Sequence, residues 1–211
     1  MKHEWRKQEK EIYLPKSTPV FLNVPEFKYF VISGEGNPNS EVFGEYIKIL
    51  YALSYAVRMS HKGGFAPDGY FEYTVYPLEG IWDLTDKGKA DYNGTLNKDE
   101  LKFDLMIRQP SFVTQEFASE IIERTGKKKP HPLLQQVHFT SITDGPSVQM
   151  LHTGSYDNEP ESFHKMEQFC ADAGLRRTAK IHREIYLSDA RKTAAENLKT
   201  VLRFSAEKIT N

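Results

Sequence analysis

The sequence predicts an α+β protein in which the order strand, helix, strand, strand occurs twice. Two observations predict this order: an internal repeat, and the similar pattern of the strands that follow each copy. The chain has 211 residues, of which 39% are hydrophobic and 27% are charged. This composition is typical of a globular protein that builds its own core.

The first copy of the repeat opens with YFVISGEGNPNSEVF at residues 29–43, and the second with QMLHTGSYDNEPESF at 149–163. Aligned without a gap, Gly34 corresponds to Gly154. Each block has the pattern of an apolar strand, a glycine turn and the start of a helix. We therefore expect a helix over 40–60 in the first copy and another over 159–173 in the second.

The later strands of the two copies also correspond. Thr74-Val75-Tyr76 matches Glu184-Ile185-Tyr186, and residues 101–109 match 198–206. In both final strands, alternate apolar residues indicate one buried face. Repeat one thus covers about 25–110 and repeat two about 146–208.

Two insertions interrupt this pattern. Residues 111–145 predict a bridging insertion with one helix that ends at Gly126, and residues 83–100 predict an exposed hairpin loop. Helix 40–60 is apolar on nearly all sides, so we expect it to bury two faces. Tyr51 and Tyr55 lie on a common face of it. They either pack against the bridging insertion or form an aromatic wall of a ligand site.

The charge balance disfavours a nucleic-acid partner, because 28 basic and 29 acidic residues leave no basic excess. The single cysteine, Cys170, excludes an intramolecular disulfide and suits a reducing compartment. The N-terminus lacks the apolar segment of a signal peptide, and residues 47–59 are too short to span a bilayer. We expect a cytoplasmic monomer or homodimer that binds no membrane and needs no metal or cofactor.

The stretch HREIYLSD, residues 182–189, is a predicted strand with Glu184 at its centre, where a carboxylate is costly to bury. Strand alternation places His182 and Tyr186 on the same face. The matching position in the first copy is Thr74, so the strand itself does not require an acid. One alternative is an ion pair at a sheet edge, for which Arg203 fits better than Arg183, since Arg183 points to the opposite face.

Four stretches resemble the GyrI-like small-molecule-binding family, which includes effector domains of multidrug-responsive regulators such as BmrR. These stretches are VPEFKYFVISGEGNP, TVYPLEGIWDL, VQMLHTGSYDNEP and HREIYLSD. The resemblance implies one GyrI-like domain over 1–211, in which two βαββ units form an antiparallel sheet with helices and a central ligand cleft. It also implies that Glu184 is the ligand contact on the floor of that cleft, in a stand-alone domain without a DNA-reading segment.

Stand-alone members of this family include the cyclopropanoid cyclopropyl hydrolases, which open cyclopropane-bearing DNA-alkylating natural products. The resemblance therefore implies a detoxifying hydrolase in which Glu184 activates water and Tyr156 hydrogen-bonds the developing phenolate. Aromatic walls suit flat hydrophobic ligands, including cationic and electrophilic ones. The further ligand-binding candidates are Trp82, Tyr55, Tyr51, Tyr76, Tyr186 and His152.

Two other functions compete with this prediction. One is a non-catalytic module that sequesters or senses hydrophobic drugs, and the other is an interaction with a macromolecule such as a topoisomerase. The near-neutral charge and the aromatic content (13 Phe, 11 Tyr, 2 Trp) favour a small-molecule site over the second. One glutamate among aromatic rings serves a hydrolase and a binding module equally, so turnover is the observation that separates them.

Overall fold

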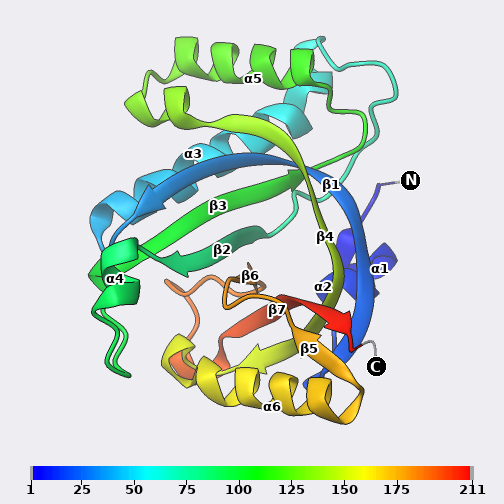
Figure 1. Ribbon diagram of the computed structural model, residues 1–211. Coiled ribbons are helices and arrows are strands. Elements are labelled where there is room, and N and C mark those ends of the chain that lie inside the picture. Colours follow the sequence, from blue (N-terminus) through cyan, green and yellow to red (C-terminus); the bar gives the residue numbers. More distant parts are fainter. Residues whose placement is uncertain (1, 210–211) are drawn as a thin grey trace. The chain divides into compact units, whose positions relative to one another are not determined.

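The computed structural model describes residues 2–209, which form helices and antiparallel β-sheet (Figure 1). The predicted α+β class is confirmed. The chain divides into two compact units. Unit one contains residues up to Glu4 and Phe27–Ile142, and unit two contains Trp5–Glu26 and the chain from Thr143 onward. Within residues 2–209, no helix is long and apolar enough to cross a membrane.

Unit one is built around β3, which pairs antiparallel with β1 and with β2. Ile32 of β1 and Gly80 of β2 both lie opposite Leu105. Its elements in chain order are β1 (Val20–Glu35, from Phe27 onward), α3 (Glu41–Met59), η1 (Ser60–Gly63), β2 (Leu78–Leu84), α4 (Asp86–Ala90), η2 (Lys98–Glu100), β3 (Leu101–Gln109), α5 (Gln115–Lys128) and η3 (Pro132–Gln136).

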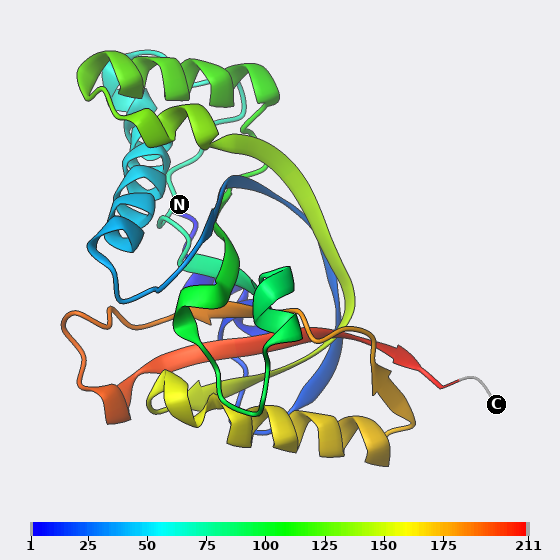
Figure 2. The same ribbon diagram turned by 60° about the vertical axis from the view of Figure 1, so that its left-hand side comes forward.

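Helix α3 buries two sides, as its all-round apolar pattern predicts. It contacts β3 on one side and α5, the helix of the bridging insertion, on the other. Figure 2 shows α3 in cyan and blue next to α5 in green. Leu50, Leu53 and Val57 are fully buried, whereas Tyr55 is exposed. The helix begins at Ser40, whose hydroxyl accepts a hydrogen bond from the Phe43 N–H.

Unit two is built around β7, which pairs antiparallel with β4, β6 and β5. Its elements in chain order are α1 (Trp5–Gln8), α2 (Lys10–Tyr13), β4 (His138–Thr153, from Thr143 onward), η4 (Tyr156–Asn158), α6 (Glu159–Asp172), β5 (Leu175–Arg177), β6 (His182–Tyr186), η5 (Ala195–Asn197) and β7 (Lys199–Lys208).

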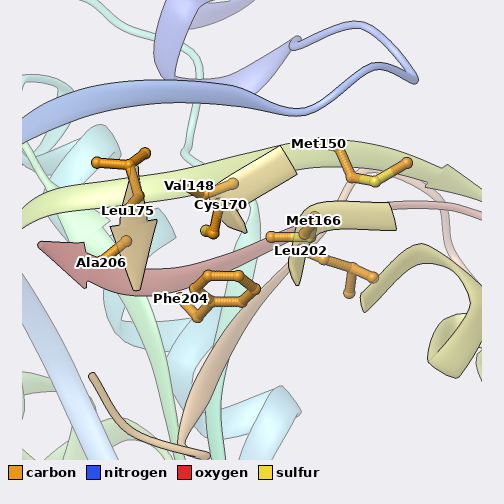
Figure 3. Close-up of a cluster of buried hydrophobic side chains, with 8 residues drawn as sticks. All are labelled: Val148, Met150, Met166, Cys170, Leu175, Leu202, Phe204 and Ala206. Carbon is orange, nitrogen blue, oxygen red and sulfur yellow. The ribbon is translucent and has the colours of Figure 1, made fainter. Parts of the chain in front are cut away.

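One face of the unit-two sheet packs against α6. Met166 and Cys170 of the helix contact apolar side chains from β4, β5 and β7, and Figure 3 shows these groups pointing toward one another. The strand residues in this cluster are Val148, Met150, Leu175, Leu202, Phe204 and Ala206. Such burial is the main stabilising contribution to the unit.

The opposite face of the same strands carries a buried polar network. Arg203 of β7 donates to the Asp144 carboxylate at 2.9 Å and to the side-chain Oε1 of Gln149 at 2.8 Å. It also donates to the backbone carbonyl of Ile12 at 2.9 Å, which ties the N-terminal segment to the sheet. Arg183 of β6 contacts the other carboxylate oxygen of Asp144 at 2.7 Å. Burial raises the pKa of Asp144, but the two arginines outweigh it and hold this pKa below its usual value.

Unit one has the predicted order strand, helix, strand, strand, whereas unit two has an additional short strand, β5, between α6 and β6. The structure also corrects the alignment between the units. The N–H of Gly36 donates to the carbonyl of Leu101, and that of Gly154 donates to the carbonyl of Leu198, at 2.8 and 3.0 Å. Both glycines have positive φ (112° and 136°), whereas Gly34 does not. Gly36, and not Gly34, is therefore the counterpart of Gly154.

The counterpart of Glu184 changes for the same reason. Residues 74–77 are not in a strand, because β2 begins only at Leu78, after a proline that has no N–H for the ladder. Glu184 lies opposite Leu202, and the equivalent position opposite Leu105 is Gly80. The prediction that Thr74 matches Glu184 was wrong. The first unit has no side chain at the position where the second has a carboxylate.

Candidate active site

Glu184 lies on β6, on the face of the sheet that α6 covers. Its position opposite Leu202 places it with the apolar cluster, and only 8% of its surface is exposed. Arg183 and Arg203 lie opposite each other on the other face, where both contact Asp144. The alternative of an ion pair between Glu184 and one of these arginines is therefore wrong. Glu184 has two other neighbours, Glu159 and His182.

Glu159 is the first residue of α6 and is buried, with 6% of its surface exposed. It hydrogen-bonds to Glu184 through its carboxyl group. His182 contacts Glu184 from the other side, with its Nε2 3.0 Å from the Glu184 Oε1. One ligand-type atom from each of the three side chains lies within 4.8 Å of the others.

The electrostatics of this cluster favour one shared proton. Burial raises the pKa of Glu159 well above its usual value, and the negative charge of Glu184 and the hydrogen bond to it raise it further. The N-terminus of α6 favours a negative charge, but burial beside a second carboxylate outweighs it. The raised pKa favours the neutral form of Glu159, which is the form that can offer a hydrogen bond to the Glu184 carboxylate.

Glu159, His182 and Glu184 are also the one place within residues 2–209 where three metal-ligating side chains converge. Carboxylate and imidazole donors suit a divalent transition metal. In the neutral form, Glu159 offers Glu184 a hydrogen bond and not a second charge. Without a metal ion, the three side chains thus suit proton sharing, whereas a bound cation would favour the ionised form of both carboxylates.

The imidazole of His182 is held in place by packing as well as by its hydrogen bond. The ring of Phe163, from the second turn of α6, meets it edge to face with 4.7 Å between the ring centres. Strand alternation places His182 on the Glu184 side of β6, as the sequence predicts. His182 and Glu159 thus both lie against the Glu184 carboxylate and restrict its orientation.

Tyr156 and Tyr186 lie next to this cluster. Tyr156 belongs to η4, the short turn before α6, and its ring meets that of Tyr186 edge to face at 6.0 Å. Burial, followed by the charges of Glu184, Glu159 and Asp189, raises the pKa of Tyr156 to about 12. The phenol therefore stays protonated at neutral pH and is a hydrogen-bond donor.

His152 is buried on β4, and both of its ring nitrogens have partners inside the protein. Its Nδ1 lies 2.9 Å from the Ser162 hydroxyl, and its Nε2 lies 3.0 Å from the Ser155 carbonyl oxygen. Only 5% of its surface is exposed. A direct ligand contact by either nitrogen requires the loss of one of these hydrogen bonds.

The other four predicted ligand-binding residues lie in unit one. Trp82 is buried and packs against Phe43 and Phe103, at 5.9 and 5.4 Å between ring centres. Tyr76 is buried, and its hydroxyl lies 3.3 Å from His3. Tyr51 and Tyr55 are neighbours on α3 with ring centres 6.3 Å apart.

Sequence reasoning placed Glu184, Tyr156 and Tyr186 together but missed Glu159. An acid in the first turn of a helix is ordinary, because it stabilises the helix end. Its meeting with Glu184, 25 residues later, depends on how α6 crosses the sheet. The available signal was the turn after Gly154, which directs the start of α6 back toward the strands.

Comparison with known proteins decides the family. The model of the GyrI-like small molecule binding domain matches residues 17–205. The chain belongs to the GyrI-like family. This GyrI-like chain matches no protein in a search of curated sequences.

Solved structures agree with this assignment. Two crystal structures of a hydrolase from Listeria innocua are 34% and 35% identical to this GyrI-like chain, with TM-scores of 0.87 and 0.89. Each comparison covers 98% of this chain and 100% of the other. The C-terminal domain of EcmrR is 16% identical with a TM-score of 0.52, over 91% of this chain and 98% of that one. It shares the fold.

Proposed function

We propose that this GyrI-like protein hydrolyses flat, hydrophobic electrophiles, and that its substrates are cyclopropane-bearing (cyclopropanoid) genotoxins. The observation that carries the proposal is the pairing of Glu184 with a neutral Glu159. Two acids whose surroundings separate their protonation states are the usual basis of acid–base catalysis at neutral pH. The hydrolase named for the Listeria innocua structures, at 34–35% identity, supports the same reaction class.

The reaction needs only water and proton transfer. A water oxygen attacks the strained cyclopropyl carbon that is conjugated to a dienone, and one ring C–C bond breaks. The electron pair of that bond moves to the dienone oxygen, which becomes a phenolate. Glu184 takes the proton from the water, and protonation of the phenolate completes an alcohol and a phenol.

The neighbours of Glu184 have separate parts in this scheme. His182 and Glu159 hold the carboxylate in one orientation, so that the base is fixed before the substrate arrives. Tyr156 donates a hydrogen bond to the oxygen that gains charge. Its pKa of about 12 suits a donor that remains protonated. Tyr186, which lies in the same unit and meets the Tyr156 ring, is the proposed stacking partner of the substrate.

A non-catalytic drug-binding module is the second candidate, because the family model that matches the chain is that of a small-molecule-binding domain. In this case, Glu184 attracts a cationic or polar group of the ligand and no bond breaks. The two candidates differ in one measurable respect, which is the appearance of product.

The test is an assay of the purified protein with a cyclopropane-bearing DNA alkylator. Chromatography with mass detection follows the ring-opened alcohol, and calorimetry follows binding. We expect the wild type to form product and Glu184→Gln to lose about 100-fold or more in kcat while it still binds the compound. Glu161→Gln, an exposed acid in the same first turn of α6 as Glu159, is the control. Binding without product in the wild type would favour the second candidate.

A further inference from the structure

His152 connects β4 to both elements that bring side chains to Glu184. Its Nε2 contacts the carbonyl of Ser155, the residue directly before Tyr156. Its Nδ1 contacts the hydroxyl of Ser162, three residues after Glu159 and on the same side of α6. One buried imidazole thus bridges the turn that carries Tyr156 and the first turn of the helix that carries Glu159.

The partners of His152 define which nitrogen carries the proton. A carbonyl oxygen only accepts hydrogen bonds, so Nε2 donates to Ser155. In the neutral imidazole, Nδ1 then accepts a hydrogen bond from the Ser162 hydroxyl. The ring therefore presents one donor and one acceptor in fixed directions, and both are used.

The segment that His152 holds has other contacts as well. The N–H of Gly154 donates to the carbonyl of Leu198, and the Tyr156 ring meets that of Tyr186. Gly154 reverses the chain with φ of 136°, and Ser155 starts η4, where its hydroxyl accepts from the Asp157 N–H at 3.3 Å. Asn158 precedes α6 without a side-chain hydrogen bond to the helix end. The two hydrogen bonds of His152 add to these contacts and join both the turn and the start of α6 to β4.

We propose that His152 is a positioning residue, which fixes Tyr156 and Glu159 with respect to Glu184 and does not contact the substrate. The proposal rests on the proposed function for its effect on turnover. Its structural content, that His152 sets the surroundings of Glu159, is independent of any substrate. An imidazole that is buried and bonded at both nitrogens cannot also bind a ligand without releasing the turn.

Four variants test this role. His152→Phe keeps a ring and removes both hydrogen bonds, whereas His152→Gln supplies one amide donor and one acceptor. Ser162→Ala removes only the Nδ1 partner. Ser147→Ala is the matched control, because Ser147 is a buried hydroxyl residue on the same strand whose hydrogen bond goes to Gly145, away from the turn.

The first readout is turnover of the cyclopropane-bearing alkylator. We expect His152→Phe to lower kcat by about 100-fold, the usual effect of misplaced catalytic groups, with KM within about threefold of the wild type. We expect His152→Gln to recover most of this loss, Ser162→Ala to lose less than His152→Phe, and Ser147→Ala to keep wild-type kcat.

The second readout needs no substrate. Carbon-13 NMR of labelled glutamate carboxyl groups follows the titration of Glu159, which the Glu159→Gln spectrum identifies. In the wild type we expect a pKa well above the usual range, and in His152→Phe a pKa closer to it, because the released turn admits water. Ser162→Ala, which is the smallest change, gives a shift in the same direction.

Two results would overturn the proposal. One is an unchanged Glu159 titration in both His152→Phe and Ser162→Ala. The other is a loss of kcat that is proportional to the loss of thermal stability in all four variants, including Ser147→Ala. If the wild type turns over no cyclopropane compound, the proposed function fails, and the NMR titration still decides the role of His152.

Discussion

A carboxyl oxygen of Glu159 lies within 4.8 Å of one of Glu184, and burial together with the Glu184 charge raises the pKa of Glu159 well above its usual value. The contact joins the first residue of α6 to the centre of β6 on the apolar side of the sheet. A single buried carboxylate there would be costly without a partner. A second, neutral acid supplies that partner and is at the same time a source of a proton.

The protonation of Glu159 predicts a dependence of stability on pH. Its pKa is raised in the folded protein, so the folded state binds the proton more tightly than the unfolded state. The stabilisation is full below the unfolded pKa near 4.3 and is lost as the pH rises through the folded pKa, by up to about 1.4 kcal/mol per pH unit. Glu159→Gln, which imitates the neutral acid, should lose less stability over this range.

Urea denaturation of both proteins between pH 5 and pH 9 measures the effect. Glu161→Gln removes an exposed acid from the same helical turn and should follow the wild type. Parallel curves for the wild type and Glu159→Gln would mean that Glu159 is ionised in the folded protein.

The Asp144 network predicts a dependence of the opposite sign. The pKa of Asp144 is lowered in the folded protein, so its stabilisation is present above the unfolded value near 3.9 and is lost as the pH falls through the folded pKa. Asp144→Asn should cost about 3–5 kcal/mol at pH 7, because it leaves Arg183 and Arg203 buried without a carboxylate.

Chemical denaturation at pH 7 and at pH 3 tests both parts of this prediction. Asp189→Asn is the control, since Asp189 pairs with the exposed Arg191, and we expect a change below about 1 kcal/mol. Equal losses in the two variants would contradict the importance assigned to the buried network.

The hydroxyl of Tyr156 predicts an effect on rate and not on binding. Tyr156→Phe removes the donor to the developing phenolate and should lower kcat by about 100-fold, while the affinity for an unreactive analogue changes little. Tyr92→Phe, an exposed tyrosine in unit one, is the control. A fall in affinity that equals the fall in kcat/KM would assign Tyr156 to ligand binding instead.

Trp82 and Tyr55 should respond differently to truncation. Trp82 packs between Phe43 and Phe103, so Trp82→Ala should cost about 3–5 kcal/mol of stability. Tyr55 is 47% exposed, so Tyr55→Ala should leave stability within about 1 kcal/mol. If both rings stack on the ligand, each truncation weakens binding by about 1–3 kcal/mol. Calorimetric titration of the folded variants decides this, and unchanged affinity removes the residue from the ligand wall.

The equivalent turn glycines offer a comparison within one molecule. Gly36→Ala and Gly154→Ala both place a side chain at positive φ and should each cost about 1–3 kcal/mol. Only Gly154 precedes the Tyr156 turn, so only Gly154→Ala should also reduce kcat when both variants are assayed folded. A Cβ at Gly154 lies 3.6 Å from His152, an ordinary contact, so the backbone and not a clash causes the effect.

The periodicity of the chain was sufficient to predict its fold class, because each apolar strand and helix carries its own local pattern. It also predicted the two buried sides of α3 and that Glu184 shares a strand face with His182. The position of the turn between β1 and α3 was not predictable from such a pattern. Gly34 and Gly36 look alike in the sequence, and only the backbone angle and the hydrogen bond to Leu101 separate them.

Apart from Tyr156 of η4, the part of the candidate site that the sequence predicted lies on one strand. His182, Glu184 and Tyr186 share a face by simple alternation, so the sequence brings them together. Glu159 joins them through the packing of α6 on the sheet, which local patterns do not contain. Thr74 was wrongly matched to Glu184 because the β-forming residues before Pro77 look like a strand, although β2 begins only after this proline.

Gly80 and Glu184 occupy the same place in two strand ladders that otherwise correspond residue by residue. The molecule thus contains the same strand pairing twice, once with a glycine at this position and once with an acid. The first unit demonstrates that the framework folds with a hydrogen atom in place of that side chain. The strand ladder itself therefore does not require an acid at this position, which agrees with the chemical role proposed for Glu184.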